Sequence, residues 1–205
     1  EQLKDLFLSR NPRLRLNTAL AKKLSERFLA ARKAAMPLWQ QGRWVYLAWN
    51  NHAVHILQKN EFFELRTARN HDLITPFEQV IFRKFKLGII GLSVGNSVAL
   101  ALAEQGAEQF RLADLDVLAL SNLNRIRAGV NSLGLNKAII TARQIYELNP
   151  YATVEVFPDG LSEKNIHAFL KNLDLAIDEA DDVVMKVKLR LIARRAGQRV
   201  RHDDL

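Results

Sequence analysis

The chain of 205 residues can form one large domain, or one domain with an appendage, and 48% of its residues are hydrophobic. It contains no cysteine, which excludes disulfide bonds, thiolate zinc sites and thioester-forming cysteines. We find no apolar run near the roughly 20 residues of a membrane span and no secretory signal, so we expect a cytoplasmic protein with no membrane partner.

The net charge of +8 comes from the leading part of the chain. Residues 1–85 contain 15 lysines and arginines against 7 aspartates and glutamates, whereas residues 86–205 contain 15 of each class. A basic leader could bind nucleic acid or an acidic partner. We favour a solvated helical face balanced by acidic surface elsewhere in a longer chain, and we do not expect nucleic acid as a partner.

In the leading segment the pattern predicts two helices and a β-hairpin. The helices are expected over residues 2–9 and 18–35. Alternating apolar residues around Asn50-Asn51 predict the hairpin over residues 44–57. Its aromatic residues are expected to pack against the helices: Trp44, Tyr46 and Trp49. We interpret residues 1–65 as a small, basic N-terminal subdomain.

A short helix is expected immediately before the central region. Thr75 as N-cap, Pro76 at the first helical position and Glu78 three residues after the cap form a capping-box signature. The helix should run to about Phe85 and lead directly into the first strand of the next domain.

Residues 86–137 predict a strand, a glycine-bearing turn, a helix and a second strand. The apolar run over residues 87–90 is typical of a buried parallel strand. The turn Gly91-Leu92-Ser93-Val94-Gly95 leads into a helix, expected from about Val98, that Gly106 can end. Phe110 to Ala113 then form the second strand. This order is a βαβ unit with a phosphate-binding turn at its start.

Gly91, Ser93 and Gly95 lie where glycine lets the backbone approach a phosphate and the following helix presents free N–H groups. Asp114, 23 residues after Gly91, and Asp116 close the second strand, and Asp114 is placed to accept hydrogen bonds from ribose hydroxyls. The turn is about one residue shorter than G-x-G-x-x-G. Two alternatives stay open: that both glycines only allow close helix–strand packing, and that Asp114 is a turn residue that ends the strand.

The residues after the second strand make the pattern more specific. Asp114-Leu115-Asp116-Val117 precedes Ser121-Asn122-Leu123-Asn124-Arg125, and Gly134-Leu135-Asn136-Lys137-Ala138 follows. In type, order and spacing these segments resemble the ThiF/MoeB/ubiquitin-activating-enzyme superfamily. Its members adenylate a carboxylate, usually the C-terminus of a small ubiquitin-like protein. The resemblance covers roughly residues 66–200.

The resemblance implies a Rossmann-like α/β domain over residues 66–205, with a doubly wound, mostly parallel sheet. Strand and helix alternate along residues 86–197, which favours the same architecture. The later elements are expected as follows: a helix over 137–148, a strand over 153–157, a helix capped by Ser162, a strand over 173–177, and a helix over 183–196 ended by Gly197.

Adenylation needs an electrophilic α-phosphate, a carboxylate held in line with it, and stabilised pyrophosphate. By the resemblance, Arg125 and Lys137 would be the catalytic cations that bind the phosphates of ATP. Asn122 would orient phosphate or ribose. Asp114 and Asp116, together with the glycine turn, would complete the nucleotide site.

The resemblance also implies a metal site and a partner subunit. Asp181 matches the acidic residue by which the family holds Mg²⁺, and Asp178 and Asp182 are neighbours that could substitute for it. Arg66 and Arg69 match an R-x-x-R run of the family. Arg69 would reach the triphosphate bound by the other subunit of a homodimer.

We therefore expect an ATP- and Mg²⁺-dependent adenylyltransferase-type domain that activates a ubiquitin-like C-terminus or a small carboxylic acid. One alternative is a nucleotide-binding interaction module without catalysis, whose basic leader docks a partner. Another is an NAD(P)-binding oxidoreductase domain, which would leave residues 122–125 and Lys137 without a function. Either alternative would share the βαβ unit.

The domain is expected to be truncated at its C-terminus, because the family continues there with another strand and the substrate-binding loops. The Gly-Leu-Ser-Val-Gly turn also resembles that of a bacterial subgroup in which this domain precedes a nitroreductase-like domain. We therefore expect a fragment of a larger bacterial protein.

Overall fold

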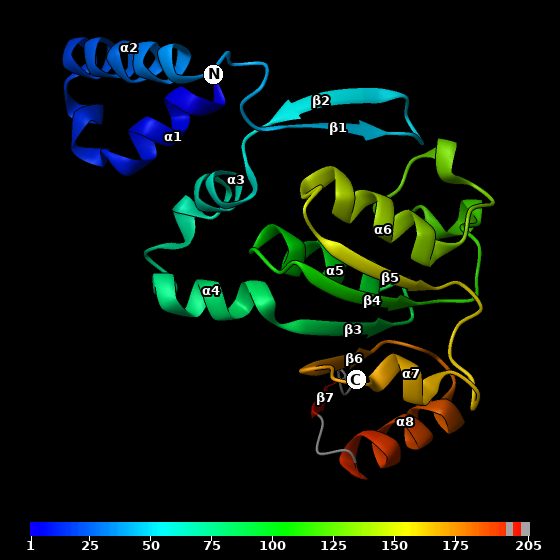
Figure 1. Ribbon diagram of the computed structural model, residues 1–205. Coiled ribbons are helices and arrows are strands. Elements are labelled where there is room, and N and C mark those ends of the chain that lie inside the picture. Colours follow the sequence, from blue (N-terminus) through cyan, green and yellow to red (C-terminus); the bar gives the residue numbers. More distant parts are fainter. Residues whose placement is uncertain (196–198, 202–205) are drawn as a thin grey trace. The chain divides into compact units, whose positions relative to one another are not determined.

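The computed structural model describes residues 1–195 and 199–201 (Figure 1). The chain folds as two compact units, Glu1–Thr75 and Pro76–Leu205. Within the described residues, every helix is too short or too polar to cross a bilayer.

The first unit combines helices with a two-stranded antiparallel hairpin. Its elements are α1 (Gln2–Arg10), the 3-10 helix η1 (Pro12–Leu16), α2 (Thr18–Ala35), β1 (Arg43–Leu47), β2 (His52–Ile56), α3 (Lys59–Arg66) and the 3-10 helix η2 (Ala68–Asn70). The two expected helices and the hairpin are confirmed, whereas α3 was not predicted. Asn51 has a φ of 56° in the hairpin turn, a conformation that asparagine tolerates better than most residues.

Two aromatic residues of the hairpin lie at the surface, so the expectation that they pack against the helices is wrong. Trp44 is 61% exposed and Tyr46 is 62% exposed. Trp44 stacks on His55 of the opposite strand, with ring centroids 4.7 Å apart. The Tyr46 hydroxyl donates to Asn51 Oδ1 at 2.7 Å. The Trp44 indole N–H donates to the Trp39 carbonyl oxygen at 3.2 Å, just before the hairpin.

An ion pair joins α1 to α3. Arg10 Nε lies 2.7 Å from Glu64 Oε1, and Arg10 Nη2 lies 2.8 Å from Glu64 Oε2. This two-point geometry suits the planar guanidinium. The hydrogen bond from Arg10 is the main reason that the pKa of the Glu64 carboxyl is lowered from its ordinary value.

We expect Glu64→Gln to remove a contribution to stability that depends on pH. Because the pKa of Glu64 is lower in the folded chain than in the unfolded chain, its contribution is present above the unfolded pKa. It is lost as the pH falls through the folded pKa. Both side chains are 40% exposed, which limits the contribution to about 0.5–1 kcal/mol. Denaturant unfolding at neutral and acidic pH measures it, with Glu26→Gln on α2 as the control; equal losses in both variants would contradict the assignment.

The second unit alternates strands and helices. Its elements are α4 (Pro76–Lys84), β3 (Lys86–Ile90), α5 (Gly95–Glu104), β4 (Gln109–Ala113), the 3-10 helices η3 (Leu120–Asn122) and η4 (Val130–Ser132), α6 (Lys137–Leu148), β5 (Thr153–Phe157), α7 (Ile166–Leu170), β6 (Leu175–Asp178), α8 (Val183–Arg195) and β7 (Arg199–Arg201). The strand order is β5-β4-β3-β6-β7, and neighbouring strands are parallel. The expected Rossmann-like α/β fold is confirmed.

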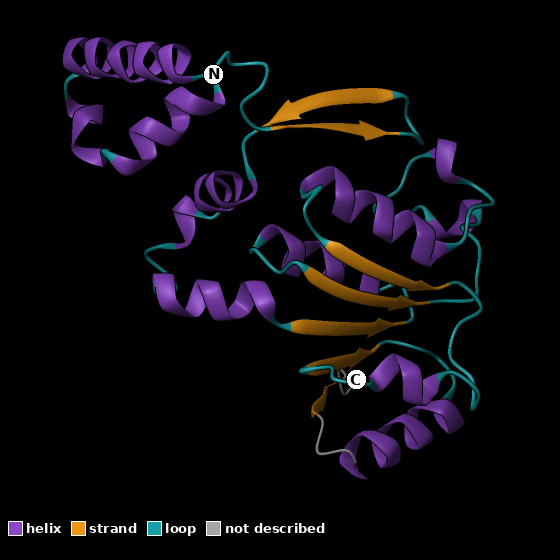
Figure 2. Ribbon diagram, in the orientation of Figure 1, coloured by secondary structure: helices purple, strands orange, loops and turns teal. Residues whose placement is uncertain are grey.

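Helices cover both faces of this sheet (Figure 2). Because side chains alternate along a strand, Ile89 and Ile90 of β3 enter different cores. Ile89 packs in the core that includes α5 and α6, whereas Ile90 packs with Phe169 of α7 and Leu189 of α8. Burial on both faces is the physical reason for the apolar run that predicted this strand.

Two later boundaries differ from the expectation. Ser162 is not the N-cap of α7, because Asn165 Oδ1 accepts a hydrogen bond from the Ser162 N–H at 2.7 Å and closes a turn there. Asn165 is the N-cap instead. β6 begins at Leu175, and Leu173 packs in the core beside α7 rather than opening the strand. The expected helix stop at Gly197 lies outside the described residues.

Candidate nucleotide site

The loops that follow β3, β4 and β6 meet at one edge of the sheet. The Gly91 N–H donates to the Ala113 carbonyl oxygen at 2.9 Å, which joins the ends of β3 and β4. The loop after β6 lies against the same turn, since a Cβ added to Gly91 would lie 2.6 Å from the Ala180 nitrogen. The chain order reverses between β3 and β6, and such a switch point is where parallel α/β sheets bind ligands.

The two glycines of the turn have different functions. Gly91 has a φ of 79°, which disfavours residues with a side chain. Gly95 begins α5 earlier than the expected Val98, and a Cβ added to it would lie 2.9 Å from Ile89 Cγ2. Close packing of α5 against β3 therefore explains the glycine at position 95. Val94, the N-cap, makes no side-chain hydrogen bond to the helix. The N–H groups of Gly95 and Ser97 donate to the carbonyl oxygens of Gly91 and Val94.

The carboxylate of Asp114 joins the glycine turn to the loop after β4. It is buried, and its Oδ2 accepts from the Leu92 N–H at 2.6 Å. Its Oδ1 accepts from the Asp116 N–H at 2.8 Å. The bond to Asp116 fits the alternative of a turn residue, whereas sequence reasoning did not predict the bond to Leu92. Each carboxylate oxygen has further acceptor capacity, so the bonds are compatible with a ribose hydroxyl as an additional donor.

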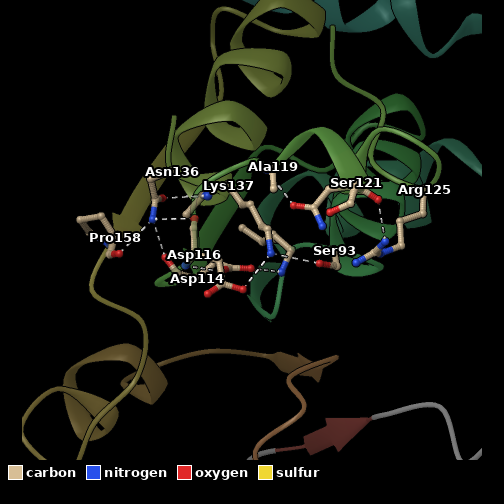
Figure 3. Close-up of polar contacts among 12 residues, drawn as sticks. Ser93, Asp114, Asp116, Ala119, Ser121, Arg125, Asn136, Lys137 and Pro158 are labelled. Atoms are coloured by element: carbon tan, nitrogen blue, oxygen red, sulfur yellow. Dashed lines mark hydrogen bonds and ion pairs between the residues drawn. The ribbon is translucent and has the colours of Figure 1, made fainter. Parts of the chain in front are cut away.

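Lys137 begins α6 and places a positive charge beside the glycine turn. Its side chain is only 6% exposed, and Nζ lies 2.8 Å from Asp116 Oδ2 and 3.3 Å from Ser93 Oγ (Figure 3). Asp116 is 58% exposed, so this ion pair reaches the surface on its acidic side. An ammonium group has three donors, of which two have these described partners.

Asn136 fixes the position of Lys137, and sequence reasoning missed it. Its Oδ1 accepts from the N–H groups of Ala138 and Ile139 and so caps α6. Its Nδ2 donates to the carbonyl oxygen of Asp114 at 2.8 Å and to that of Pro158 at 3.0 Å (Figure 3). An asparagine directly before a predicted helix is a capping signal that could have identified it.

Asn122 and Arg125 belong to the loop beyond β4, and their described hydrogen bonds are local. Asn122 is buried, and its Oδ1 accepts from the Ala119 N–H at 2.9 Å. Arg125 is exposed and donates through Nη1 to the Ser121 carbonyl oxygen at 3.3 Å and to Asn124 Oδ1 at 3.1 Å. The structure thus joins Ser93, Asp114, Asp116 and Lys137 in one cluster and holds Arg125 separately.

The acidic residues after β6 have different surroundings. Asp182 Oδ1 accepts from the N–H groups of Val184 and Met185 and caps α8. Asp178 is buried and accepts from the Ala180 N–H, whereas Asp181 is exposed. Across the described residues, no three His, Asp or Glu side chains gather into a metal site.

Arg69 lies in the 3-10 helix η2 of the first unit, three residues after Arg66 at the end of α3. The candidate nucleotide site lies wholly in the second unit. The function expected for Arg69 therefore stays a prediction.

These features define a Rossmann-like α/β domain. The model of the ThiF family matches residues 67–202, and the chain belongs to this family. Homologues within the family include adenylyltransferases.

Two proteins are similar to the chain in sequence, and one solved structure is similar to it in fold. The uncharacterized protein MT1398 of Mycobacterium tuberculosis is 44% identical over 156 residues, which are 76% of this chain and 22% of that protein. The adenylyltransferase and sulfurtransferase MOCS3 of Dictyostelium discoideum is 32% identical over 64% of this chain and 32% of its own length. Escherichia coli tRNA N6-threonylcarbamoyladenosine dehydratase, TcdA, in complex with ATP has a TM-score of 0.66 and 25% identity, covering 72% of this chain and 61% of that one. The chain thus spans about a fifth of the length of the Mycobacterium tuberculosis protein and about a third of the length of the Dictyostelium discoideum protein.

Proposed function

We propose that this chain is the adenylating part of a larger ThiF-type protein. It binds ATP and converts a carboxylate into an acyl-adenylate, with release of pyrophosphate. The observation that carries this proposal is the buried ammonium of Lys137, held between Ser93 of the glycine turn and Asp116 of the D-x-D segment. A lysine in that place matches the charge of a phosphate.

The reaction forms one bond and breaks another. A carboxylate oxygen attacks the α-phosphorus, the bond from that phosphorus to the bridging oxygen breaks, and pyrophosphate leaves with the electron pair. The chain contributes positioning and charge. Lys137 and Arg125 stabilise the phosphate charge. Asp114 holds the ribose, and Asn122 orients phosphate or ribose.

Mg²⁺ is the metal that fits these residues. Asp181 offers an exposed carboxylate close in sequence to the edge of the sheet, and its neighbour Asp182 is already used to cap α8. Bound by Asp181 and phosphate oxygens, the ion would neutralise phosphate charge.

The further partners are part of the same proposal. A ubiquitin-like C-terminus or a small acid supplies the carboxylate, and the chain acts in the cytoplasm as a homodimer. Arg69 of one subunit would then contact the triphosphate bound by the other.

Calorimetric titration of ATP with Mg²⁺, and separately of NADH, tests the proposal on the wild type and on Arg125→Ala. We expect ATP to bind, NADH not to bind, and Arg125→Ala to weaken ATP binding about tenfold, as for a lost charged hydrogen bond. Arg127→Ala, a second exposed arginine of this loop, is the control and should bind ATP normally.

Each other outcome is informative. Absence of ATP binding, or equal effects of both arginine variants, would contradict the assigned site. Binding of NADH would favour an oxidoreductase domain. ATP binding without pyrophosphate exchange in the presence of candidate carboxylates would favour a nucleotide-binding interaction module.

A further inference from the structure

We propose that Asn96 is a positioning residue that holds Lys137 and the loop of Arg125 in register with the glycine turn. An effect of Asn96 on catalysis depends on the function proposed above. Asn96 is the second residue of α5, directly after Gly95, and its side chain is fully buried. The sequence motifs did not single it out.

One hydrogen of the Asn96 amide leads to Lys137. Asn96 Nδ2 donates to Thr141 Oγ1 at 2.9 Å. The Thr141 hydroxyl in turn donates to the Lys137 carbonyl oxygen at 2.9 Å. Thr141 is also buried, so this two-bond path is shielded from water. It ties the first turn of α5 to the first turn of α6.

The other hydrogen leads to the loop that carries Arg125. Asn96 Nδ2 donates to Gln144 Oε1 at 2.8 Å. The Gln144 Nε2 group donates to the carbonyl oxygen of Arg127, two residues after Arg125. A single amide therefore connects the glycine turn with both elements that supply the proposed cations.

The acceptor side of the same amide has no hydrogen-bond partner in the described part of the chain. Among the described residues, none donates a hydrogen bond to Asn96 Oδ1, although the atom is buried. Leaving a buried acceptor unpaired costs stability. An apolar side chain would avoid this cost if the position served packing alone. The two hydrogen bonds that Asn96 donates, to Thr141 and Gln144, are thus what distinguishes asparagine from an apolar residue at this position.

Small displacements of these elements matter for the site. The Lys137 ammonium reaches Ser93 and Asp116 from the first residue of α6, so a shift of that helix turn displaces the charge directly. Misplacement by about an ångström can lower rates strongly when catalysis depends on alignment. Asn96 acts through Lys137 and Arg125 in this scheme and does not touch the substrate.

Asn96→Leu, Thr141→Val and Thr141→Ser test the proposal. Leucine removes both donors and keeps the branching and the number of heavy atoms of the side chain. Valine removes the Thr141 hydroxyl, and serine retains it. Calorimetry with ATP and with AMP, which lacks the β- and γ-phosphates, should show ATP binding weakened about tenfold by the first two variants and AMP binding much less affected. Thr141→Ser should bind ATP as tightly as the wild type does.

Hydrogen exchange without nucleotide provides a second and independent readout. Asn96→Leu should speed exchange in residues 91–95, 122–128 and 137–141. It should leave residues 166–170 of α7, on the other face of the sheet, unchanged. Unchanged exchange in the first three segments would overturn the inference. So would equal weakening of ATP and AMP together with a lower melting temperature, which indicates only a structural function. If the wild type fails to bind ATP, the proposed function fails, while the exchange result still decides the positioning of Lys137.

Discussion

Lys137→Ala should slow ATP–pyrophosphate exchange by on the order of 100-fold, which corresponds to about 3 kcal/mol of lost transition-state stabilisation. The ammonium is buried, so its charge is screened less than that of a surface lysine. It also lies beside the turn at which the phosphates are expected. Its removal leaves pyrophosphate to depart without this compensating charge.

The fold should survive this substitution. Asp116, the acidic partner of Lys137, is largely exposed and can be solvated once the lysine is gone. We therefore expect a small change in melting temperature beside the large change in rate. Lys188→Ala is the matched control, because Lys188 also forms an ion pair, with Glu163, but on the opposite face of the sheet. Equal rate losses in both variants would remove Lys137 from the site.

Apolar runs and capping residues in the sequence predicted most of the strands and helices of the second unit. Burial on both faces of β3 produces a continuous apolar run, and the capping signature at Thr75-Pro76 marked the start of α4 correctly. Ser162 misled the prediction of α7, since a side-chain bond from Asn165 competes with helix formation there. Such local competition is not visible in hydrophobic periodicity.

The site was predictable as a set of residues but not as a network. Motif spacing pointed to Ser93, Asp116 and Lys137, which the structure joins by hydrogen bonds. It gave no sign that the Asp114 carboxylate holds the Leu92 N–H, nor that Asn96 links α5 to α6. These bonds join positions 22 and 45 residues apart in the sequence. Only the folded sheet brings them together.

Gly91→Ala should lower the free energy of unfolding by about 3 kcal/mol or more, through two effects that add. The first is the φ of 79°, which costs a residue with a side chain about 1–2 kcal/mol. The second is a collision, because the added Cβ would lie 2.6 Å from the backbone of Glu179 and Ala180. Backbone atoms cannot rotate away as a flexible side chain can, so the loop after β6 must move.

Gly134→Ala separates these two effects. Gly134 has a φ of 81°, almost the same as that of Gly91, but a Cβ added there would meet no described atom within 4 Å. We therefore expect this variant to lose only the conformational cost of about 1–2 kcal/mol. Denaturant unfolding of both variants measures the difference, which reports how closely the loop after β6 lies against the glycine turn. Because that loop carries Asp181, Gly91→Ala should also weaken ATP binding in the presence of Mg²⁺, whereas Gly134→Ala should not. Equal losses of stability would mean that the loop yields freely and that Gly91 is required for its backbone conformation alone.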